Sequence, residues 1–223
     1  MKKPKNKTKT YPFYKVMRFI LKPIYIICYR PKVINKQVIP KTGPIIICGN
    51  HGHAFDQCNV VLGTKRPIRY MAKKEYFDGI HSLFGKPSKL GCALSKWLVE
   101  HVGCIRVDRS IKDDNAKAAA IEALNNGDAI GLFPEGTRNK TDAFLLPFKF
   151  GAVSMAQKTG ATIVPFANTG EFKIFKRNHL SIRFGEPFKV PKDMNLEEAN
   201  EKLYNIVSDL KKQGLEAIEN GKH

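Results

Sequence analysis

Short apolar runs alternate with amphipathic stretches along most of the chain. The apolar runs are typical of buried strands, which we predict at 45–48, 68–72, 104–107, 129–133, 162–166 and 179–184. The amphipathic stretches predict helices at 56–63, 88–102, 114–126, 150–159 and 195–218. Because strands alternate with helices, we expect one α/β domain with a largely parallel or mixed central sheet flanked by helices.

The first forty residues differ from the rest of the chain. Residues 1–10 are rich in Lys and Thr, and we expect them to be disordered. Residues 11–29 predict an amphipathic helix, in which Lys15, Arg18 and Lys22 form a basic stripe. The apolar positions of this helix are Phe13, Val16, Met17, Ile20, Leu21 and Ile24. We therefore divide the chain into a basic tail with a helical segment over 1–40 and an α/β domain over 41–223.

The amphipathic helix has two readings: it packs on the domain, or it lies in a membrane interface. Three cations argue against a helix that spans the bilayer, since each costs about 2.5–3.5 kcal/mol at its centre. The amphipathic rings of Tyr14, Tyr25 and Tyr29 and the lysines go beyond what core packing requires. We therefore expect a membrane-binding helix in the interface, with its basic arm on anionic headgroups.

The chain is strongly basic, with a formal net charge of +18 and a pI near 9.7. Residues 1–41 hold 12 Lys and Arg, and the first acidic residue is Asp56. This balance implies an anionic partner: nucleic acid, anionic lipid or a phosphorylated substrate. Nucleic-acid signatures are absent from the sequence and the basic arm is hydrophobic, so we expect an anionic membrane surface and no nucleic acid.

The cysteine content bears on the compartment. The five cysteines are odd in number and show no C-x-x-C spacing, which fits a reduced, cytosol-facing protein. No secretory signal is recognisable at the N-terminus. Together with the basic helix, this predicts a peripheral or monotopic protein on the cytoplasmic face of the cell membrane.

One candidate for chemistry follows the predicted strand at 45–48. His51 stands where the chain leaves the sheet, and Asp56 stands at the start of the next predicted helix, where a carboxylate suits the orphan N–H groups. A carboxylate can hold an imidazole in one tautomer and make its far nitrogen a better proton acceptor. The pair predicts a general base that acts on a hydroxyl. Backbone N–H groups of the same loop are candidates for stabilising an oxyanion.

Polar side chains also follow three other predicted strands. They are Lys73, Asp108 with Arg109, and the segment Glu135 to Arg138. Functional residues of α/β sheets gather where strands end in loops, and Arg binds phosphate with two parallel N–H groups. Each of these cations, taken alone, is typical of a solvated surface charge. Their common placement at strand ends predicts a phosphate clamp beside the base.

Four sequence blocks resemble motifs of a known protein family. The blocks are Asn50-His51 with Asp56, Gly103 to Arg109, Phe133 to Arg138, and Ile163-Val164-Pro165. In order and spacing they resemble the four motifs of the glycerolipid acyltransferases, and the bacterial 1-acyl-glycerol-3-phosphate acyltransferases are the nearest type. The resemblance covers about residues 40–190. Arg106 departs from the pattern, because an apolar residue is common at that position.

The resemblance implies an acyltransferase domain in which His51 is the base and Asp56 orients it. It implies that the acceptor phosphate and glycerol are bound by Lys73, Arg109, Glu135, Gly136, Thr137 and Arg138. The implied reaction moves a fatty acyl group from acyl-CoA or acyl carrier protein to the 2-hydroxyl of lysophosphatidic acid. The product would be phosphatidic acid, in phospholipid biosynthesis, and no cofactor is implied. The alternatives are another lysophospholipid or glycerol 3-phosphate as acceptor, a thioester hydrolase, and a nucleic-acid-binding module.

A metal centre is another reading of the His51 loop. Its candidate ligands are Cys48, His51, His53, Asp56 and Cys58. Their spacing matches no zinc pattern and no compact second group of ligands follows, so we expect no metal. The aromatic residues Trp97 and those within 144–150 belong either to the core or to an acyl groove, and the sequence leaves both readings open.

Overall fold

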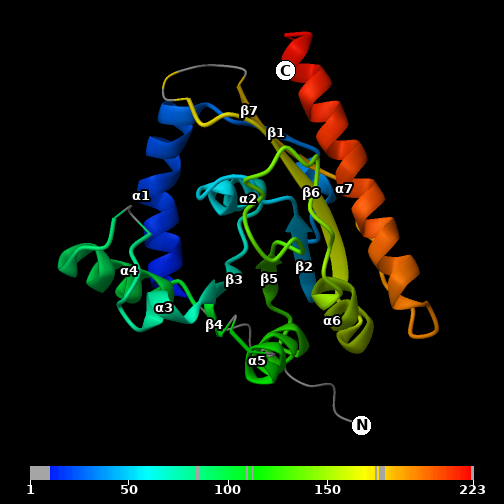
Figure 1. The fold of residues 1–223 in the computed structure, drawn as a ribbon, viewed down its shortest axis with the longest axis horizontal. Coiled ribbons are helices and arrows are strands. Elements are labelled where there is room, and N and C mark those ends of the chain that lie inside the picture. Colours follow the sequence, from blue (N-terminus) through cyan, green and yellow to red (C-terminus); the bar gives the residue numbers. More distant parts are fainter. Residues whose placement is uncertain are drawn as a thin grey trace.

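The computed structural model describes residues 11–83, 86–108, 110–111, 113–173, 175 and 179–221. Its centre is a seven-stranded sheet with the order β1-β7-β6-β2-β5-β3-β4 (Figure 1). The strands are β1 (Lys32–Ile34), β2 (Ile45–Gly49), β3 (Ile68–Lys73), β4 (Ile105–Val107), β5 (Ala129–Leu132), β6 (Thr162–Gly170) and β7 (Leu180–Phe184). Every neighbouring pair is parallel except β6 and β7, so the sheet is mixed, as expected.

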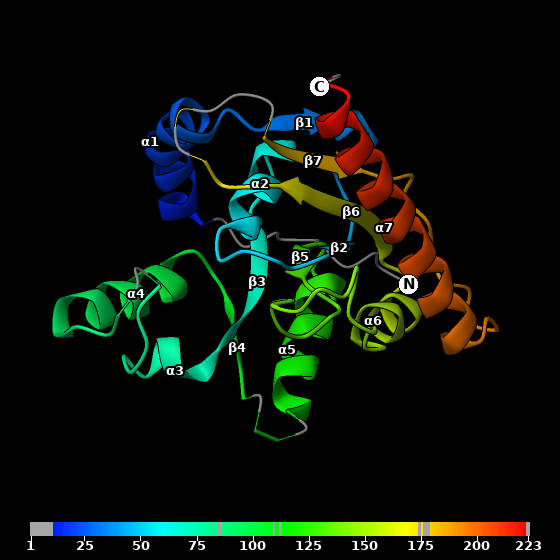
Figure 2. The same cartoon turned by 45° about the horizontal axis from the view of Figure 1, so that its top comes forward.

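Helices flank both faces of this sheet. They are α1 (Pro12–Tyr29), α2 (Asp56–Gly63), α3 (Lys74–Phe77), α4 (Lys89–His101), α5 (Asp114–Asn125), α6 (Gly151–Thr159) and α7 (Leu196–Glu219), with a 3₁₀ turn η1 at Lys36–Val38. Figures 1 and 2 both show α7 running beside β6. The α/β prediction is confirmed, and the start and end of α2 agree with the predicted 56–63.

The strand β2 opens with three consecutive isoleucines because both of its faces are buried. Ile45, Ile46 and Ile47 have no exposed surface, and successive side chains of a strand point to opposite faces. Ile46 belongs to the core cluster that includes residues of α5, α6 and α7. Ile45 and Ile47 belong to the cluster on the other face, with Val60 of α2. The strand is thus buried between two helical layers, which is the usual setting of a parallel sheet.

The sequence did not predict three short elements, β1, η1 and α3, each of which has four residues or fewer. The strand β1 pairs in parallel with β7, with Lys32 opposite Ser181. The sheet therefore includes residues from the stretch 1–40 that we expected to hold only a tail and a helix. The predicted disordered tail, residues 1–10, lies outside the described residues.

Arg106, the departure from the family pattern, lies on β4 at the edge of the sheet. Its side chain is exposed, and its guanidinium Nη1 lies 2.8 Å from Oδ1 of Asp78. A charged residue is well suited to an edge strand, where it discourages pairing with another chain. The packing of β4 accommodates this arginine without burying its charge.

The helix α1 turns its polar side toward the domain. Tyr14 is buried, the guanidinium Nη1 of Arg18 donates to the carbonyl of Thr64, and the Tyr25 hydroxyl donates to Asn59 Oδ1. The apolar residues with the most exposed side chains are Val16, Phe19, Ile20, Leu21, Ile24, Ile26 and Ile27. Of the predicted apolar face, Phe13 and Met17 are half-buried, and the Phe13 ring packs edge-on against Trp97 of α4 at 4.4 Å. Neither α1 nor another helix in the described part of the chain is long and apolar enough to cross a membrane.

Candidate active site

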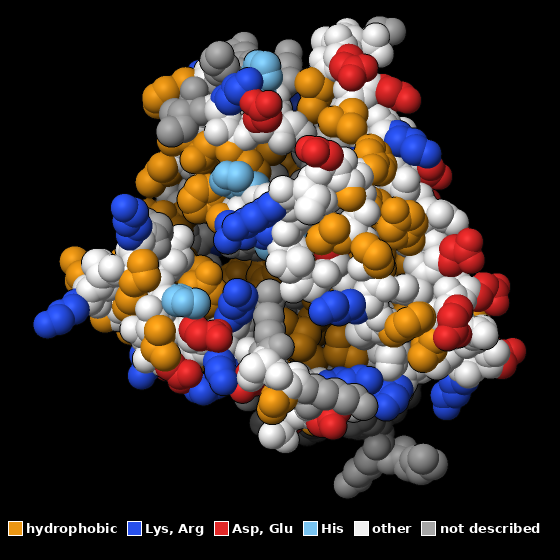
Figure 3. Space-filling model, in the orientation of Figure 1, with side chains coloured by type: hydrophobic (Ala, Val, Ile, Leu, Met, Phe, Trp, Pro, Cys, Tyr) orange, Lys and Arg blue, Asp and Glu red, His pale blue; other side chains and the backbone are white. Residues whose placement is uncertain are grey.

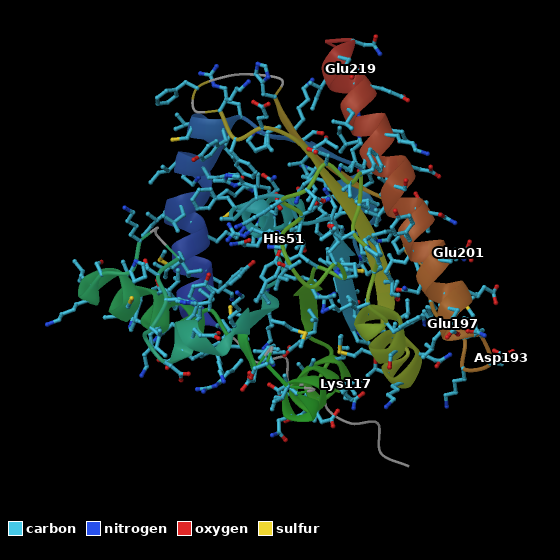
Figure 4. All side chains as sticks on the ribbon, in the orientation of Figure 1. His51, Lys117, Asp193, Glu197, Glu201 and Glu219 are labelled. Atoms are coloured by element: carbon cyan, nitrogen blue, oxygen red, sulfur yellow. The ribbon has the colours of Figure 1, made fainter. Side chains whose placement is uncertain are left out.

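The loop that carries His51 leaves the sheet at the carboxyl end of β2. Gly49 is needed there, because a Cβ atom at this position would lie 2.0 Å from the carbonyl oxygen of Phe166 on β6. The strand β5 pairs in parallel with β2, and β3 pairs in parallel with β5. The carboxyl ends of all three strands therefore lie at the same end of the sheet. Figure 4 shows His51 near the centre of the molecule in this view.

Asp56 holds the His51 ring and the loop between them. Its Oδ2 atom lies 3.0 Å from His51 Nδ1 and accepts the backbone N–H groups of Gly52 and His53, at 2.8 and 2.7 Å. The Asp56 carboxylate is buried and α2 begins at this residue, as predicted, but the N–H groups it binds belong to the loop before the helix. With Asp56 on Nδ1, the proton resides there and Nε2 is left as the proton acceptor.

The face of the imidazole is fixed by an aromatic ring. Phe133, directly after β5, stacks on His51 with ring centroids 4.0 Å apart and planes 14° apart. Phe133 in turn stacks on Tyr70 and meets the edge of Phe166. Asp56 thus restrains the ring edge and Phe133 the ring plane, a role that sequence reasoning had not given to Phe133.

Glu135 connects the two loops of the site. Its carboxylate is buried, with Oε1 accepting the His51 N–H at 2.7 Å and Oε2 accepting the Leu146 N–H at 2.9 Å. The Asn139 N–H returns a bond to the His51 carbonyl at 2.7 Å. Burial raises the pKa of Glu135, and the bonds from Leu146 and His51 oppose that shift. Glu135 therefore fixes the backbone of the His51 loop relative to Leu146.

These bonds also bear on where an oxyanion could be stabilised. The backbone N–H of His51 donates to Glu135, and those of Gly52 and His53 donate to Asp56. The expectation that the N–H groups of this loop stabilise an oxyanion is wrong for these three groups, because each is already used to shape the loop.

Lys73, Gly136, Thr137 and Arg138, which were also expected at the site, follow the carboxyl ends of β3 and β5. Gly136 has a φ of +74°, which favours glycine, and Thr137 and Arg138 follow it with exposed side chains. Lys73 ends β3, which lies two strands from β2, or about 10 Å along the edge. Figure 3 shows a hollow near the middle of this face, with hydrophobic side chains at its floor and Lys or Arg side chains around it.

The segment before Arg109 is held at the end of β4. The Lys74 ammonium lies 2.6 Å from Asp108 Oδ2, and this bond, followed by bonds from Ser110, lowers the pKa of Asp108 to about 2. Asp108 also receives support through its own N–H, which donates to Asp113. Arg109 itself lies outside the described residues.

Lys211 lies near the site although it belongs to none of the four sequence blocks. Lys211 of α7 donates to the Phe144 carbonyl, and its ammonium lies 4.6 Å from the centre of the Phe144 ring. Desolvation lowers the pKa of Lys211, while the charges of Glu135 and Asp56 act in the opposite direction. Sequence reasoning missed this lysine because a polar residue on a helix 76 positions after Glu135 carries no local signal.

The potential metal ligands of the loop serve other purposes. His53 stacks on Phe172 at 4.0 Å, and its Nδ1 accepts the Phe55 N–H. Burial raises the pKa of Cys58 to about 11 and that of Cys48 further, which disfavours the thiolate a metal requires. Within the described ranges, no three His, Cys, Asp or Glu side chains are grouped to hold a metal ion.

A histidine oriented by a carboxylate at the carboxyl end of the strands of a mixed α/β sheet is an arrangement that can perform general-base catalysis. A family model described as Acyltransferase matches residues 30–169, and the chain belongs to this acyltransferase family. The 1-acyl-sn-glycerol-3-phosphate acyltransferase of Bacillus subtilis (strain 168) is 30% identical over 181 residues, which cover 78% of this chain and 81% of that protein. The protein of the same name from Borreliella burgdorferi is 35% identical over 146 residues, which cover 64% of this chain and 53% of that protein.

A solved structure has the same fold. It is the crystal structure of the 1-acyl-sn-glycerophosphate (LPA) acyltransferase PlsC from Thermotoga maritima, with a TM-score of 0.66. The match covers 94% of this chain and 79% of that one at 23% sequence identity, so it bears on the fold alone. The family that the four sequence blocks suggested is confirmed.

Proposed function

We propose that this acyltransferase moves a fatty acyl group from a thioester to the 2-hydroxyl of 1-acyl-sn-glycerol 3-phosphate, giving phosphatidic acid. The names of the Bacillus and Borreliella relatives support this acceptor. The single observation that carries the chemistry is the 3.0 Å contact between His51 Nδ1 and the buried Asp56 carboxylate. It leaves Nε2 free to take a proton from an acceptor hydroxyl.

The transfer needs one base and no covalent enzyme intermediate. Nε2 of His51 removes the hydroxyl proton as the acceptor oxygen attacks the thioester carbonyl carbon. The tetrahedral intermediate then collapses, the carbon–sulfur bond breaks, and the thiolate receives the proton back from His51. Asp56 stabilises the imidazolium formed between these two steps.

Cations at the sheet edge would hold the acceptor phosphate. Arg138 has an exposed side chain on the loop that Glu135 fastens to His51, and Lys73 lies at the end of β3. We assign the phosphate to these two residues, with Arg109 from the second sequence block. Gly136 and Thr137 shape the turn between Glu135 and Arg138, so that a phosphate on Arg138 brings the hydroxyl toward His51.

The acceptor is a lipid, which makes a bilayer surface the natural place of reaction. The outward apolar residues of α1, beside Lys15, fit a helix that lies in the interface of an anionic membrane. We therefore propose peripheral or monotopic attachment, on the cytoplasmic face, where acyl-CoA and acyl carrier protein are found. Both donors are anionic, and the basic surface suits either.

The test offers the purified protein each donor, acyl-CoA or acyl carrier protein, with 1-acyl-glycerol 3-phosphate, glycerol 3-phosphate or a lysophospholipid without a free phosphate. Mass spectrometry identifies the product. We expect phosphatidic acid from the first acceptor, and His51→Ala should lower kcat by about 10²–10⁴-fold with unchanged folding. Free fatty acid as the main product would favour a hydrolase, and near-normal turnover by His51→Ala would end the proposed mechanism.

A further inference from the structure

A chain of buried side-chain amides runs from α1 to the catalytic loop. The Tyr25 hydroxyl donates to Asn59 Oδ1 at 2.6 Å, and Asn59 Nδ2 donates to Asn168 Oδ1 at 3.1 Å. Asn59 lies on α2, one turn after Asp56, and Asn168 lies on β6. Both asparagines are buried, so three elements that are far apart in sequence meet through these two amides.

Asn168 also forms two hydrogen bonds with Asn50, the residue before His51. The Asn168 N–H donates to Asn50 Oδ1 at 2.7 Å, and Asn50 Nδ2 donates to the Asn168 carbonyl at 2.9 Å. The β2–β6 ladder ends with Gly49 opposite Phe166, and the Asn50 side chain then takes the place of a paired backbone. The main chain is therefore free to leave the sheet at His51 while the end of β2 stays fastened to β6.

The same residue reaches the other end of the loop. Asn168 Nδ2 points to the Asp56 carbonyl at 3.5 Å, so Asn168 contacts both Asn50 and Asp56. The residues between them carry the histidine and the N–H groups that shape the carboxylate site. Through backbone and amide, Asn168 thus restrains the loop at both ends.

Burial gives these contacts their weight. A buried amide is unfavourable unless its donor and acceptor atoms are paired, and here each amide oxygen and nitrogen of Asn59 and Asn168 has a partner. Burial raises the pKa of the Tyr25 hydroxyl, which keeps it protonated as the donor that completes the chain. Removing that donor leaves Asn59 Oδ1 buried without its partner, at a position one helical turn from Asp56.

We propose that Tyr25, Asn59 and Asn168 form a positioning network through which the seating of α1 sets the geometry of the His51–Asp56 pair. The inference rests on the proposed function of that pair. It makes the helix with the outward apolar face part of the structure that aligns the base. A small displacement of the base is costly, because misplacement by about 1 Å from a remote substitution can lower a rate 10²-fold.

The test compares Tyr25→Phe with Tyr29→Phe on the same helix. The centroids of the two rings lie 5.0 Å apart, and of these two tyrosines only Tyr25 has a hydroxyl that forms a hydrogen bond with a described residue. Tyr25→Phe should lower kcat about 10-fold on a water-soluble, short-chain acceptor, with little change in KM and in vesicle binding. Tyr29→Phe should behave as the wild type.

Two further readouts separate positioning from general loss of stability. The proton on His51 Nδ1, identified in the NMR spectrum by its absence from His51→Ala, should shift or broaden in Tyr25→Phe and not in Tyr29→Phe. Asn59→Asp keeps the oxygen that accepts from Tyr25 and loses the donor to Asn168. It should cause the same loss of kcat, and the double variant Tyr25→Phe/Asn59→Asp should lose less than the product of the two single losses.

A Tyr25→Phe variant with the kcat and the His51 resonance of Tyr29→Phe would overturn the network. That result would leave the proposed function intact if His51→Ala is still inactive. Conversely, an active His51→Ala would end the proposed function, while the NMR comparison would still report on the network because it needs no turnover.

Discussion

The helices α1 and α7 are both long and amphipathic, yet they face the domain with opposite sides. α7 lies along β6 and buries Leu203 and Val207 completely, and its acidic residues lie on the side away from the sheet, as Glu197 and Glu201 do in Figure 4. α1 meets the domain with Tyr14, Arg18 and Tyr25. The apolar side chains of α1 point away from the domain: Phe19 is 83% exposed and Ile27 59% exposed, whereas Leu203 of α7 is 0% exposed.

This difference teaches that an apolar stripe does not say what covers it. Burying apolar surface drives α7 onto the sheet, at roughly 25 cal/mol per Å². α1 contacts the domain through hydrogen bonds, the buried Tyr14 ring and the half-buried Phe13, while most of its large apolar side chains are exposed. Large exposed apolar patches of this kind mark interaction sites with proteins or membranes.

The strongest challenge to the comparison is to place charge on the outward side of α1. Phe19→Asp with Ile27→Asp should weaken binding to anionic vesicles about 10²–10⁴-fold, since each large apolar side chain contributes about 1.5–3 kcal/mol on burial. The urea unfolding midpoint should not change. Leu215→Asp, at a partly exposed apolar position of α7, is the control. Equal vesicle binding by the two proteins would remove α1 from the membrane.

Core truncation tests the other half of the comparison. Leu203→Ala on α7 should lower the free energy of unfolding by about 2–5 kcal/mol, because it leaves a cavity in the core. Ile20→Ala on α1 should change it by less than about 0.5 kcal/mol. Denaturant titration measures both. If Ile20→Ala costs as much as Leu203→Ala, the apolar side of α1 is packed against protein in solution.

A third substitution asks whether phosphate recognition belongs to the strand ends and not to the helices. Arg138→Ala should raise KM for the acceptor about 10- to 100-fold, since a hydrogen bond to a charged group is worth about 1.5–3 kcal/mol. Lys212→Ala, an exposed cation of α7, should have the wild-type KM. Steady-state kinetics decides this. A change confined to the donor KM would mean that Arg138 binds the thioester substrate instead.

The smallest effect concerns the basic stripe of α1. Lys15→Ala should weaken binding to anionic vesicles about 5-fold, which corresponds to about 1 kcal/mol per surface cation, and should not affect binding to neutral vesicles. Flotation at two salt concentrations measures the difference. The same loss on neutral vesicles would show that Lys15 acts through packing and not through charge.

The sequence predicted much of this molecule because its strongest signals are local. The apolar run of β2 and the helical spacing of α7 follow from neighbours in the chain, and both elements are confirmed. The His51–Asp56 contact could be predicted because the two residues are close in sequence, with one short loop between the end of β2 and the start of α2. By contrast, β1 is three residues long and becomes a strand only through its pairing with β7.

The features that sequence reasoning missed depend on long-range contacts. Asn168 meets Asn50 across 118 positions, and Phe133 meets the His51 ring across the β2–β5 pair. A single asparagine in a strand or a phenylalanine before a proline has no pattern that marks it. The periodicity alone could not say which apolar residues of α1 pack on the domain, since it is the same for a helix that faces lipid and for one that faces a core. Phe13 and Met17 are half-buried, whereas Val16, Ile20, Leu21 and Ile24 are exposed.

Tryptophan fluorescence offers the most direct measurement of the claim that α1 meets a bilayer with its apolar side. The chain has one tryptophan, Trp97, so a Trp97→Phe background can carry either Phe19→Trp on α1 or Leu215→Trp on α7. Both proteins are mixed with anionic vesicles whose acyl chains carry bromine, which quenches tryptophan inside the hydrocarbon. The outward orientation of α1 predicts strong quenching for Phe19→Trp and none for Leu215→Trp. Equal fluorescence of Phe19→Trp with brominated and unbrominated vesicles, under conditions where the protein floats with both, would contradict it.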